Sequence, residues 1–171
     1  MVRDSRLPWI VARFADMPII GARDPVPLMY KIRLDNRFEV IHPADGALAI
    51  VNTLRVEKLW GSQQLLLIGG GPKCQMTYRD YLFTMLKAVG IGSLPEELFS
   101  KDEYVTDWLD SKESQRLLRY QRHSFQEIAT EISDHLGWKR HLIPIVRRFE
   151  RKKIIKMSPY YKDLKGDMQS G

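Results

Sequence analysis

The stretch QQLLLIGGGPKCQMTYRDYLFTMLKAVG, from Gln63 to Gly90, carries the pattern that decides the fold class. Its first part, Gln63–Gly71, is a short apolar run ended by glycines, which is typical of a strand buried on both faces. Its second part has apolar residues at helical spacing, with Thr77 as the N-cap and Gly90 as the left-handed terminator. A strand followed by a helix is the repeating unit of α/β proteins.

Two further stretches upstream extend this order. LPWIVARF, Leu7–Phe14, is a continuous apolar run with β-branched and aromatic residues, and it predicts a second buried strand. FEVI, Phe38–Ile41, predicts a short strand, and Asp45 is expected to cap a helix that follows from Gly46. One face of that helix is predicted to be apolar, formed by Ala47, Val51 and Leu54 with Leu48 beside them.

The second half of the chain is predicted to be mainly helical. EYVTDWL, Glu103–Leu109, is interpreted as one more strand, and a helix is expected to open at Asp110. The capping box of Ser124 and Glu127 begins the clearest helix of the chain, which stops at Gly137. A last helix is predicted from Pro144 to about Lys156.

Only a few strands are predicted, and two of them are apolar enough to be buried on both faces. Such strands need neighbours that a small sheet does not supply. We therefore expect an α/β fold with a few mostly parallel strands, crossover helices and a helical C-terminal region, forming part of a larger sheet. The uncovered edge of the strand at 9–14 predicts self-association or a partner.

The composition of the chain limits the classes of protein to which it can belong. The chain has 171 residues, of which 44% are hydrophobic and 28% charged, so one packed domain is expected rather than disorder. No apolar run reaches the ~20 residues of a membrane span, and we expect no signal peptide. The single cysteine, Cys74, excludes an internal disulfide and a zinc site built from cysteines, and it favours a cytoplasmic location.

The net charge of +6 is concentrated near the C-terminus. Residues 139–156 hold most of the excess of Lys and Arg, whereas the remainder of the chain is close to neutral. We therefore divide the chain into residues 1–138 and a basic, helical tail at 139–171. For that tail three interpretations stay open: a helix docked on the domain, a helix on an anionic membrane surface, and a nucleic-acid contact, which the sparse aromatic residues disfavour.

His42 and Asp45 lie three residues apart in an otherwise apolar run. The structural interpretation is a joint between strand and helix in which Asp45 caps the helix. The catalytic interpretation is a His–Asp dyad, which would need a nucleophile that no Ser or Cys motif supplies. We expect neither catalytic residues nor a metal site in this chain.

Four pieces of the sequence, taken in order, resemble the C-terminal half of the NAD-dependent epimerase/dehydratase family, the extended and atypical short-chain dehydrogenases. The resemblance covers residues 3 to about 138. The pieces are the strand and loop LPWIVARFADMPIIG, the strand-to-helix joint FEVIHPADGALAIVNTL, the strand, turn and helix LLLIGGGPKCQMTYRDYLFTMLKAVG, and the segment DWLDSKESQRLLRYQRHSFQEIATEI. The resemblance implies the C-terminal part of a Rossmann-like fold.

The resemblance also implies a cofactor, NAD or NADP, bound by the complete family fold. The glycine motif G-x-x-G-x-x-G that cradles its pyrophosphate is not found here, and Gly69–Gly71 is interpreted as a turn. The catalytic Tyr-x-x-x-Lys has one formal match, Tyr161 to Lys165, which we attribute to chance. We therefore expect the chain alone to be inactive and to bind no cofactor tightly.

The family's sites map onto a few positions. The resemblance places Arg13, Phe14, Ala15 and Asp16 beside the cofactor, through backbone groups of the last three, although Arg13 could equally pair with a carboxylate such as Asp16 or Asp45. Arg37 lies one residue away from the position of a phosphate-binding arginine, and His42 is expected near the small-molecule substrate. Two functions follow: the substrate-side part of an NAD(P)-dependent epimerase or dehydratase, or a non-catalytic binding or structural subunit.

Overall fold

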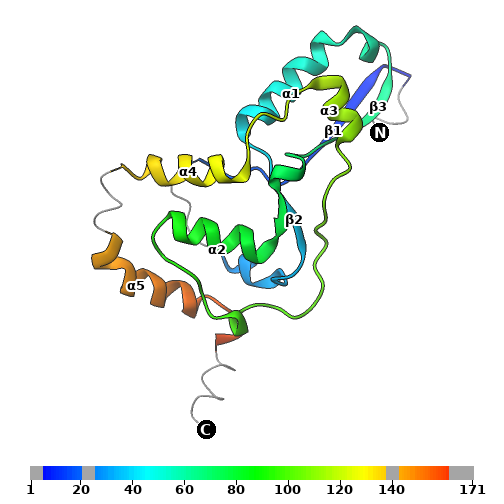
Figure 1. Ribbon diagram of the computed structural model, residues 1–171. Coiled ribbons are helices and arrows are strands. Elements are labelled where there is room, and N and C mark those ends of the chain that lie inside the picture. The colour runs from blue at the N-terminus through cyan, green and yellow to red at the C-terminus, as the bar shows by residue number, and fades with distance from the viewer. Residues whose placement is uncertain (1–5, 21–25, 138–142, 162–171) are drawn as a thin grey trace. The chain divides into compact units, whose positions relative to one another are not determined.

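The computed structural model describes residues 6–20, 26–137 and 143–161, and the side chains within them except those of 143–146. The chain is α/β (Figure 1). Its strands and helices, in order, are β1 (Trp9–Phe14), β2 (Arg37–Glu39), α1 (Pro43–Arg55), β3 (Gln63–Ile68), β4 (Gln75–Thr77), α2 (Tyr78–Ala88), α3 (Lys112–Leu118), α4 (Phe125–His135) and α5 (Ile143–Lys156).

Two compact units share the described residues. The first unit takes the described parts of 1–18, 39–75 and 108–128, and the second takes those of 19–38, 76–107 and 129–171. The first unit therefore contains β1, α1, β3 and α3, and the second contains α2 and α5. The predicted boundary between residues 138 and 139 lies outside the described residues.

The first unit is organised by a parallel pair of strands. β1 pairs with β3 in the register Trp9↔Gln63 to Phe14↔Ile68, which confirms both strands predicted from their apolar runs. Just beyond β1, Asp16 forms a parallel bridge with Val40. The other described sheet pairs β2 with β4.

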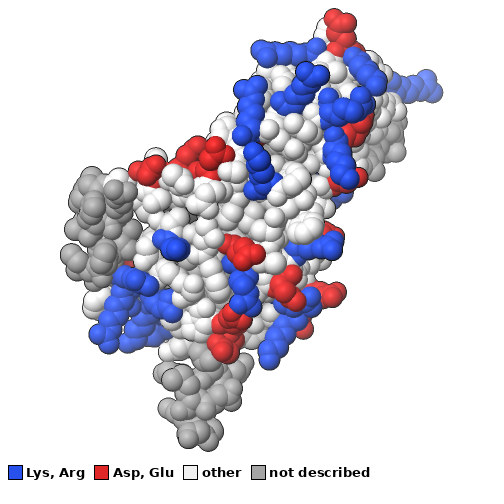
Figure 2. Space-filling model, in the orientation of Figure 1, with Lys and Arg blue, Asp and Glu red and all other residues white. Residues whose placement is uncertain are grey.

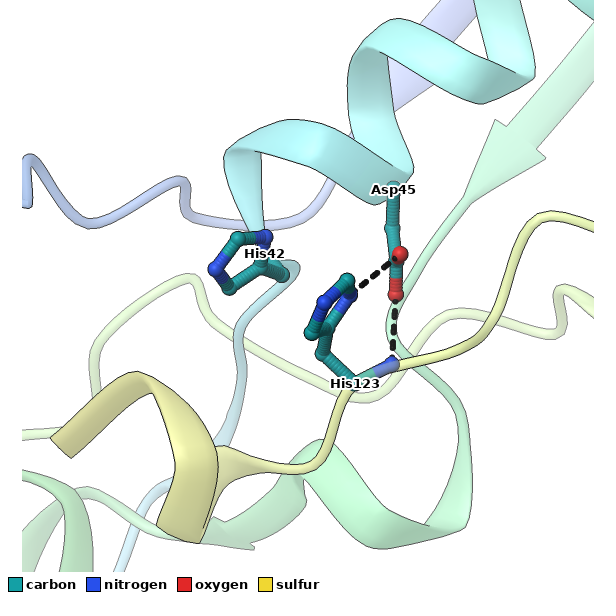
Figure 3. Close-up of side chains that lie close together, drawn as sticks. All are labelled: His42, Asp45 and His123. Carbon is teal, nitrogen blue, oxygen red and sulfur yellow. Dashed lines mark hydrogen bonds and ion pairs between the residues drawn. The ribbon is translucent and has the colours of Figure 1, made fainter. Parts of the chain in front are cut away.

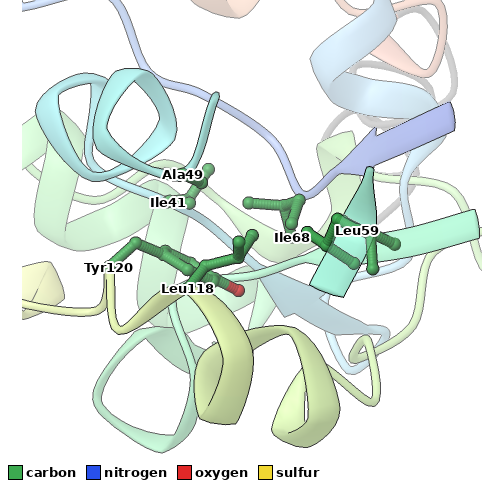
Figure 4. Packing of buried hydrophobic residues seen from close by; sticks show 7 residues of the cluster. Ile41, Ala49, Leu59, Ile68, Leu118 and Tyr120 are labelled. Carbon is green, nitrogen blue, oxygen red and sulfur yellow. The ribbon is translucent and has the colours of Figure 1, made fainter. Parts of the chain in front are cut away.

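One face of the β1–β3 pair is covered by a hydrophobic core. Leu66 and Ile68 of β3 pack with Ala49 of α1 and Leu118 of α3, and all four are at most 4% exposed (Figure 4). The remaining buried members are Ile41, Leu59 and Tyr120. On the opposite face Leu65 keeps 41% of its surface exposed. Because side chains alternate along a strand, this pair of strands is covered on one face and open on the other.

Helix α1 differs from the prediction at its start and in its buried face. It begins at Pro43 with His42 as the N-cap, so Asp45 is not the cap; Asp45 lies in the first turn and is buried. The residues turned to the core are small, Gly46 and Ala49, which allow the helix backbone to approach closely. The larger apolar residues are exposed: Ile50 by 54%, Val51 by 41% and Leu54 by 72%.

The second unit contains the helix that the sequence predicted best. Thr77 caps α2, its hydroxyl accepting a hydrogen bond from the Asp80 N–H at 3.1 Å. Buried Tyr78, Leu82 and Leu86 form its packed face, and Gly90 has the left-handed φ of +80° that ends the helix. These features confirm the predicted helix and its terminator.

The strand predicted at 103–109 is wrong, because no strand lies in that segment. Its polar groups are used otherwise: the side chain of Asn36 donates to Tyr104 O and Thr106 Oγ1, and Val105 is fully exposed.

The helix predicted from Asp110 is α3, which begins two residues later. The capping box of α4 is confirmed, since Ser124 Oγ and the Glu127 carboxylate contact each other at 2.7 Å. In the described ranges, no helix is both long and apolar enough to cross a bilayer.

Candidate functional site

Asp45 is the centre of a polar cluster in the first unit. It is 1% exposed, yet three groups donate hydrogen bonds to it. Its Oδ2 accepts from the backbone N–H groups of Arg122 at 2.9 Å and His123 at 3.0 Å, and its Oδ1 lies 2.7 Å from Nδ1 of His123 (Figure 3). Both carboxylate oxygens are therefore satisfied, which offsets the cost of burying the group.

His42 adds a second imidazole to this cluster. Its Nδ1 accepts a hydrogen bond from the Ala44 N–H at 3.1 Å, which satisfies one of the free donors at the start of α1. Its ring stacks on that of His123 with centroids 4.0 Å apart and planes 20° apart. His42 is buried, whereas 31% of the His123 side chain is exposed.

The cluster resembles a metal site in its donor types. His42, Asp45 and His123 each offer a ligand atom, and these atoms lie within 4.8 Å of one another. Two imidazoles and a carboxylate suit zinc or ferrous iron. However, Asp45 Oδ1 and His42 Nδ1 already take part in hydrogen bonds within the protein, so a cation that used these two atoms would have to displace them. The geometry supports a contact that holds residues 122–123 against the start of α1.

The contact between the Asp45 carboxylate and the His123 imidazole also has a chemical consequence. With its Nδ1–H bound to Asp45, His123 presents Nε2 as its second ring nitrogen, which is the arrangement of a general base. A general base acts on a substrate only when a reacting group reaches it. In the described residues the neighbouring thiol, that of Cys74, is buried, and burial raises its pKa to about 12, with the Asp45, Glu39 and Glu127 carboxylates adding to the effect. This thiol is therefore not a nucleophile for the pair.

The turn Gly69–Gly71 after β3 packs closely against other parts of the first unit. A Cβ added at Gly69 would lie 2.1 Å from Glu39 Oε1, and one at Gly70 would lie 2.3 Å from the Val40 carbonyl oxygen. Gly71 has a φ of +75°, and a Cβ added there would lie 2.5 Å from Gln121 Oε1. These glycines are needed for close packing, and their backbone is already covered by protein atoms.

Glu39 is the second buried carboxylate of the first unit. It is 3% exposed and accepts three hydrogen bonds, from the N–H of Gly71 at 3.0 Å, the Gln75 side chain at 3.1 Å and the N–H of Leu109 at 2.7 Å. Gly71 and Gln75 flank the single turn Pro72–Cys74, and Leu109 lies in the segment before α3. Glu39 therefore joins the glycine turn to the segment that leads into α3.

A cavity of about 340 Å³ lies beside the glycine turn. Amide and hydroxyl side chains surround it together with two cations of α3, Lys112 at its first residue and Arg116 in its last turn. Arg116 already pairs with Glu113, at 2.6 Å. The remaining lining residues are Gly71, Pro72, Gln75, Leu109, Asp110, Ser111, Gln115 and Gln121.

The residues predicted beside a cofactor follow one another at the carboxyl end of β1. Arg13 is exposed and Phe14 packs against the core. The N–H of Ala15 donates to Ile68 O at 3.0 Å, and that of Asp16 donates to Glu39 O at 3.2 Å. These two backbone donors are therefore used within the protein. Asp45, suggested as a partner for Arg13, is held by His123 instead.

The two residues predicted on the substrate side fall in different units. His42 belongs to the first unit, in the cluster with Asp45. Arg37 belongs to the second, where its guanidinium, with the side chain 63% exposed, lies 3.6 Å from the Asp107 carboxylate. The match Tyr161 to Lys165 cannot be placed in full, because Lys165 lies outside the described residues.

Three residues of the cluster and turn were missed by the sequence analysis. His123 and Tyr120 lie in the last of the four pieces that carry the resemblance, but they were not singled out there, and Glu39 is one acid in a short strand. Tyr120 is buried, and its hydroxyl contacts both the N–H and the carbonyl of Gly69, at 3.1 and 2.9 Å. Burial raises its pKa. The one available signal was the charge of Glu39 between the apolar residues Phe38 and Val40.

Comparison with known proteins gives a fold and no family assignment. No family model matches the chain, and no curated protein matches it. Among solved structures, it is similar to a UDP-N-acetylglucosamine 4-epimerase from Bacillus cereus, with a TM-score of 0.52 and 18% identity over 72% of this chain and 46% of that one.

A second similar structure is a UDP-glucuronic acid 4-epimerase from Bacillus cereus, solved in complex with UDP-glucuronic acid and NAD. Its TM-score is 0.54, at 18% identity over 75% of this chain and 45% of the epimerase. The chain thus spans less than half the length of either protein. The likeness shows that the fold is that of part of a Rossmann-like epimerase, as the sequence predicted.

Proposed function

We propose that this chain is the C-terminal, substrate-side portion of an NAD(P)-dependent epimerase/dehydratase-like oxidoreductase. The observation that carries the proposal is the likeness to two UDP-sugar 4-epimerases over about three quarters of the chain. The parallel β1–β3 pair followed by helices agrees with it. The NAD bound by the second epimerase supports the proposed cofactor.

The substrate in this proposal is a nucleotide sugar, since both similar enzymes are named for UDP-sugars. His42 would lie on the substrate side from the first unit, and Arg37 would contact a phosphate, for which a guanidinium is well suited. Arg13, Phe14, Ala15 and Asp16 would border the nicotinamide. Because the N–H groups of Ala15 and Asp16 already serve the sheet, the contact would come from other groups of this segment.

We propose that the complete fold binds the cofactor and that this chain alone does not bind it tightly. A dinucleotide site needs glycines whose backbone N–H groups are open to the pyrophosphate. At Gly69–Gly71 the space is taken by Glu39, Val40 and Gln121. The chain is accordingly proposed to be inactive in hydride transfer when alone. The single buried cysteine, Cys74, agrees with a location in the reducing cytoplasm.

A partner follows from the open surfaces of the first unit. In its described part, β1 pairs along its length only with β3, and Leu65 on the open face is 41% exposed. Parallel strands are ordinarily buried on both faces. We therefore propose that an N-terminal Rossmann portion, or failing that a second copy of the chain, covers this face and the exposed Ile50 and Leu54 of α1.

Calorimetry on the full chain tests this function. UDP-glucuronic acid is expected to bind weakly, UMP to compete with it, and NADH to release no measurable heat. Arg37→Gln should weaken UDP-sugar binding at least threefold, whereas Arg55→Gln, an exposed arginine of α1, should leave it unchanged. Micromolar NADH binding would contradict the proposed lack of a dinucleotide site. A lack of UDP-sugar binding would contradict the proposal that this chain contributes to the substrate site.

The second candidate is a non-catalytic binding or structural subunit, which the exposed apolar residues of α1 favour. Sedimentation tests whether a second copy of the chain covers the exposed apolar residues of α1. The chain should self-associate at high concentration, and the pair Ile50→Ser and Leu54→Ser should shift it toward monomer without changing its stability. A clean monomer at every concentration would remove the argument for a covered face.

A further inference from the structure

Helix α5 uses one of its faces to bind the rest of the second unit. Arg147 Nε donates to the Ile91 carbonyl at 3.2 Å, and the Arg151 guanidinium donates to the Ser93 carbonyl. Ile154 is 3% exposed, and just past the helix Ser158 Oγ donates to a backbone carbonyl at 2.7 Å. These residues recur at helical spacing, so they define the inner face of α5.

The opposite face carries a different set of side chains. Phe149, Lys152, Lys153 and Lys156 follow the spacing i, i+3, i+4 and i+7, so they share one face of the helix. All four are exposed, and Phe149 keeps 77% of its surface accessible. No ion pair or hydrogen bond of these side chains is found among the residues that the structure describes. We call this set the outer face of α5.

The outer face is not needed to fold the second unit. Among the described side chains, those of Arg147, Arg151, Ile154 and Ser158 attach α5 to the second unit, and no hydrogen bond involves Phe149. Figure 2 shows Lys and Arg side chains gathered over α5, and Glu150 is the one acid in the described part of this helix. Phe149 therefore stands with three lysines on a face that combines an exposed apolar ring with positive charge.

We propose that the outer face of α5 binds the surface of an anionic lipid bilayer. An aromatic ring flanked by lysines is the pattern of helices that lie in the membrane interface. The ring enters the boundary between headgroups and acyl chains, while the lysine stems extend their ammonium groups to the lipid phosphates and carboxylates. This binding is independent of the proposed enzyme function.

The geometry fits a bilayer better than a nucleic acid. The outer face is a single convex helix surface with one aromatic residue, whereas single-stranded nucleic acid is held by several stacking rings in a groove. Lysine also provides a point charge without the planar fork by which arginine reads a phosphate. The two arginines of the inner face are already bound to backbone carbonyls. A broad, fluid, negatively charged surface therefore matches best.

Flotation of the full chain with vesicles tests the proposal. Vesicles of phosphatidylcholine with about one third phosphatidylserine are compared with vesicles of phosphatidylcholine alone, in about 0.1 M salt. Each lysine near such a surface is worth roughly a fivefold change in partitioning. The triple variant Lys152→Gln, Lys153→Gln and Lys156→Gln should thus lose about a hundredfold of its binding, and Phe149→Ser should lose several-fold.

A matched variant separates this face from the net charge. Lys58→Gln, Lys87→Gln and Lys101→Gln remove the same charge from exposed positions elsewhere and should lose less than about threefold. Thermal unfolding establishes that every variant is folded. Equal losses in the two triple variants, or binding of a single-stranded oligonucleotide with no binding of anionic vesicles, would overturn the proposal. So would equal binding to both kinds of vesicle.

Discussion

Asp45 and His123 lie 78 positions apart in the sequence and meet through a 2.7 Å contact between Oδ1 and Nδ1. The same carboxylate accepts the backbone N–H groups of Arg122 and His123 through Oδ2. One buried side chain at the start of α1 thus holds the loop that precedes α4. This contact explains why an acid is tolerated in the apolar interior of the first unit.

Asp45→Asn should therefore lower the free energy of unfolding by about 2 kcal/mol, because the amide keeps the shape of the side chain but cannot accept all three hydrogen bonds. Urea unfolding of the full chain measures the loss. Asp134→Asn, on an exposed position of α4, should change stability by less than about 0.5 kcal/mol. Equal effects of the two substitutions would show that the cluster does not stabilise the first unit.

The elements with strong local signals were predictable from sequence, and the faces they bury were not. The capping of α2 by Thr77 depends on residues within one turn, so it could be predicted. For α1 the apolar residues Val51 and Leu54 were expected to face the core. In the structure small Gly46 and Ala49 take that place, because close approach of the backbone decides the packing there. Size complementarity across elements is not visible in a single periodic pattern.

The glycine turn gives a prediction with an internal control. Gly61 and Gly71 have nearly the same φ, +73° and +75°, but an added Cβ meets nothing within 4 Å at Gly61 and meets Gln121 at 2.5 Å at Gly71. Gly61→Ala should cost about 1 kcal/mol of stability from backbone strain alone. Gly71→Ala should cost more than Gly61→Ala, because Gln121 must also move. Gly70→Ala should lower stability by about 3 kcal/mol or more, because its Cβ would meet the Val40 carbonyl oxygen. Chemical denaturation measures all three, and equal costs at positions 61 and 71 would contradict the packing role.

Cys74 should be inert to thiol reagents in the folded protein. Burial and three nearby carboxylates raise the pKa of its thiol to about 12. At about pH 8 roughly one thiol in 10⁴ is then ionised, and the thiolate is the reactive form. Labelling with a chromogenic disulfide should follow the rate of unfolding and become fast in denaturing urea. Rapid labelling of the folded chain in buffer would show that the packing around Cys74 is open.

The candidate site was less predictable than the fold for a physical reason. His42 and Asp45 were found because they are close in sequence, but their roles are exchanged: the histidine caps α1 and the acid reaches across the unit. His123 and Tyr120 are placed by tertiary contacts with residues more than 50 positions away. No local spacing encodes such a contact, so only the folded chain reveals it.

The capping box of α4 predicts a stability that depends on pH. The N–H and hydroxyl of Ser124 hold the pKa of the Glu127 carboxyl below its ordinary value of 4.5. A depressed pKa in the folded state means that the charged carboxylate stabilises the protein above pH 4.5, and that this contribution is lost as the pH falls through the folded-state pKa.

Glu127→Gln retains an oxygen acceptor but cannot ionise. Its unfolding midpoint should lie below that of the wild type at about pH 7, and the difference should narrow as the pH falls below 4.5. Ser124→Ala removes the hydroxyl donor and keeps the backbone N–H, so in that background the pH-dependent difference between Glu127 and Gln should shrink in part. A difference that stays constant across this range would show that the carboxylate charge does not act through Ser124.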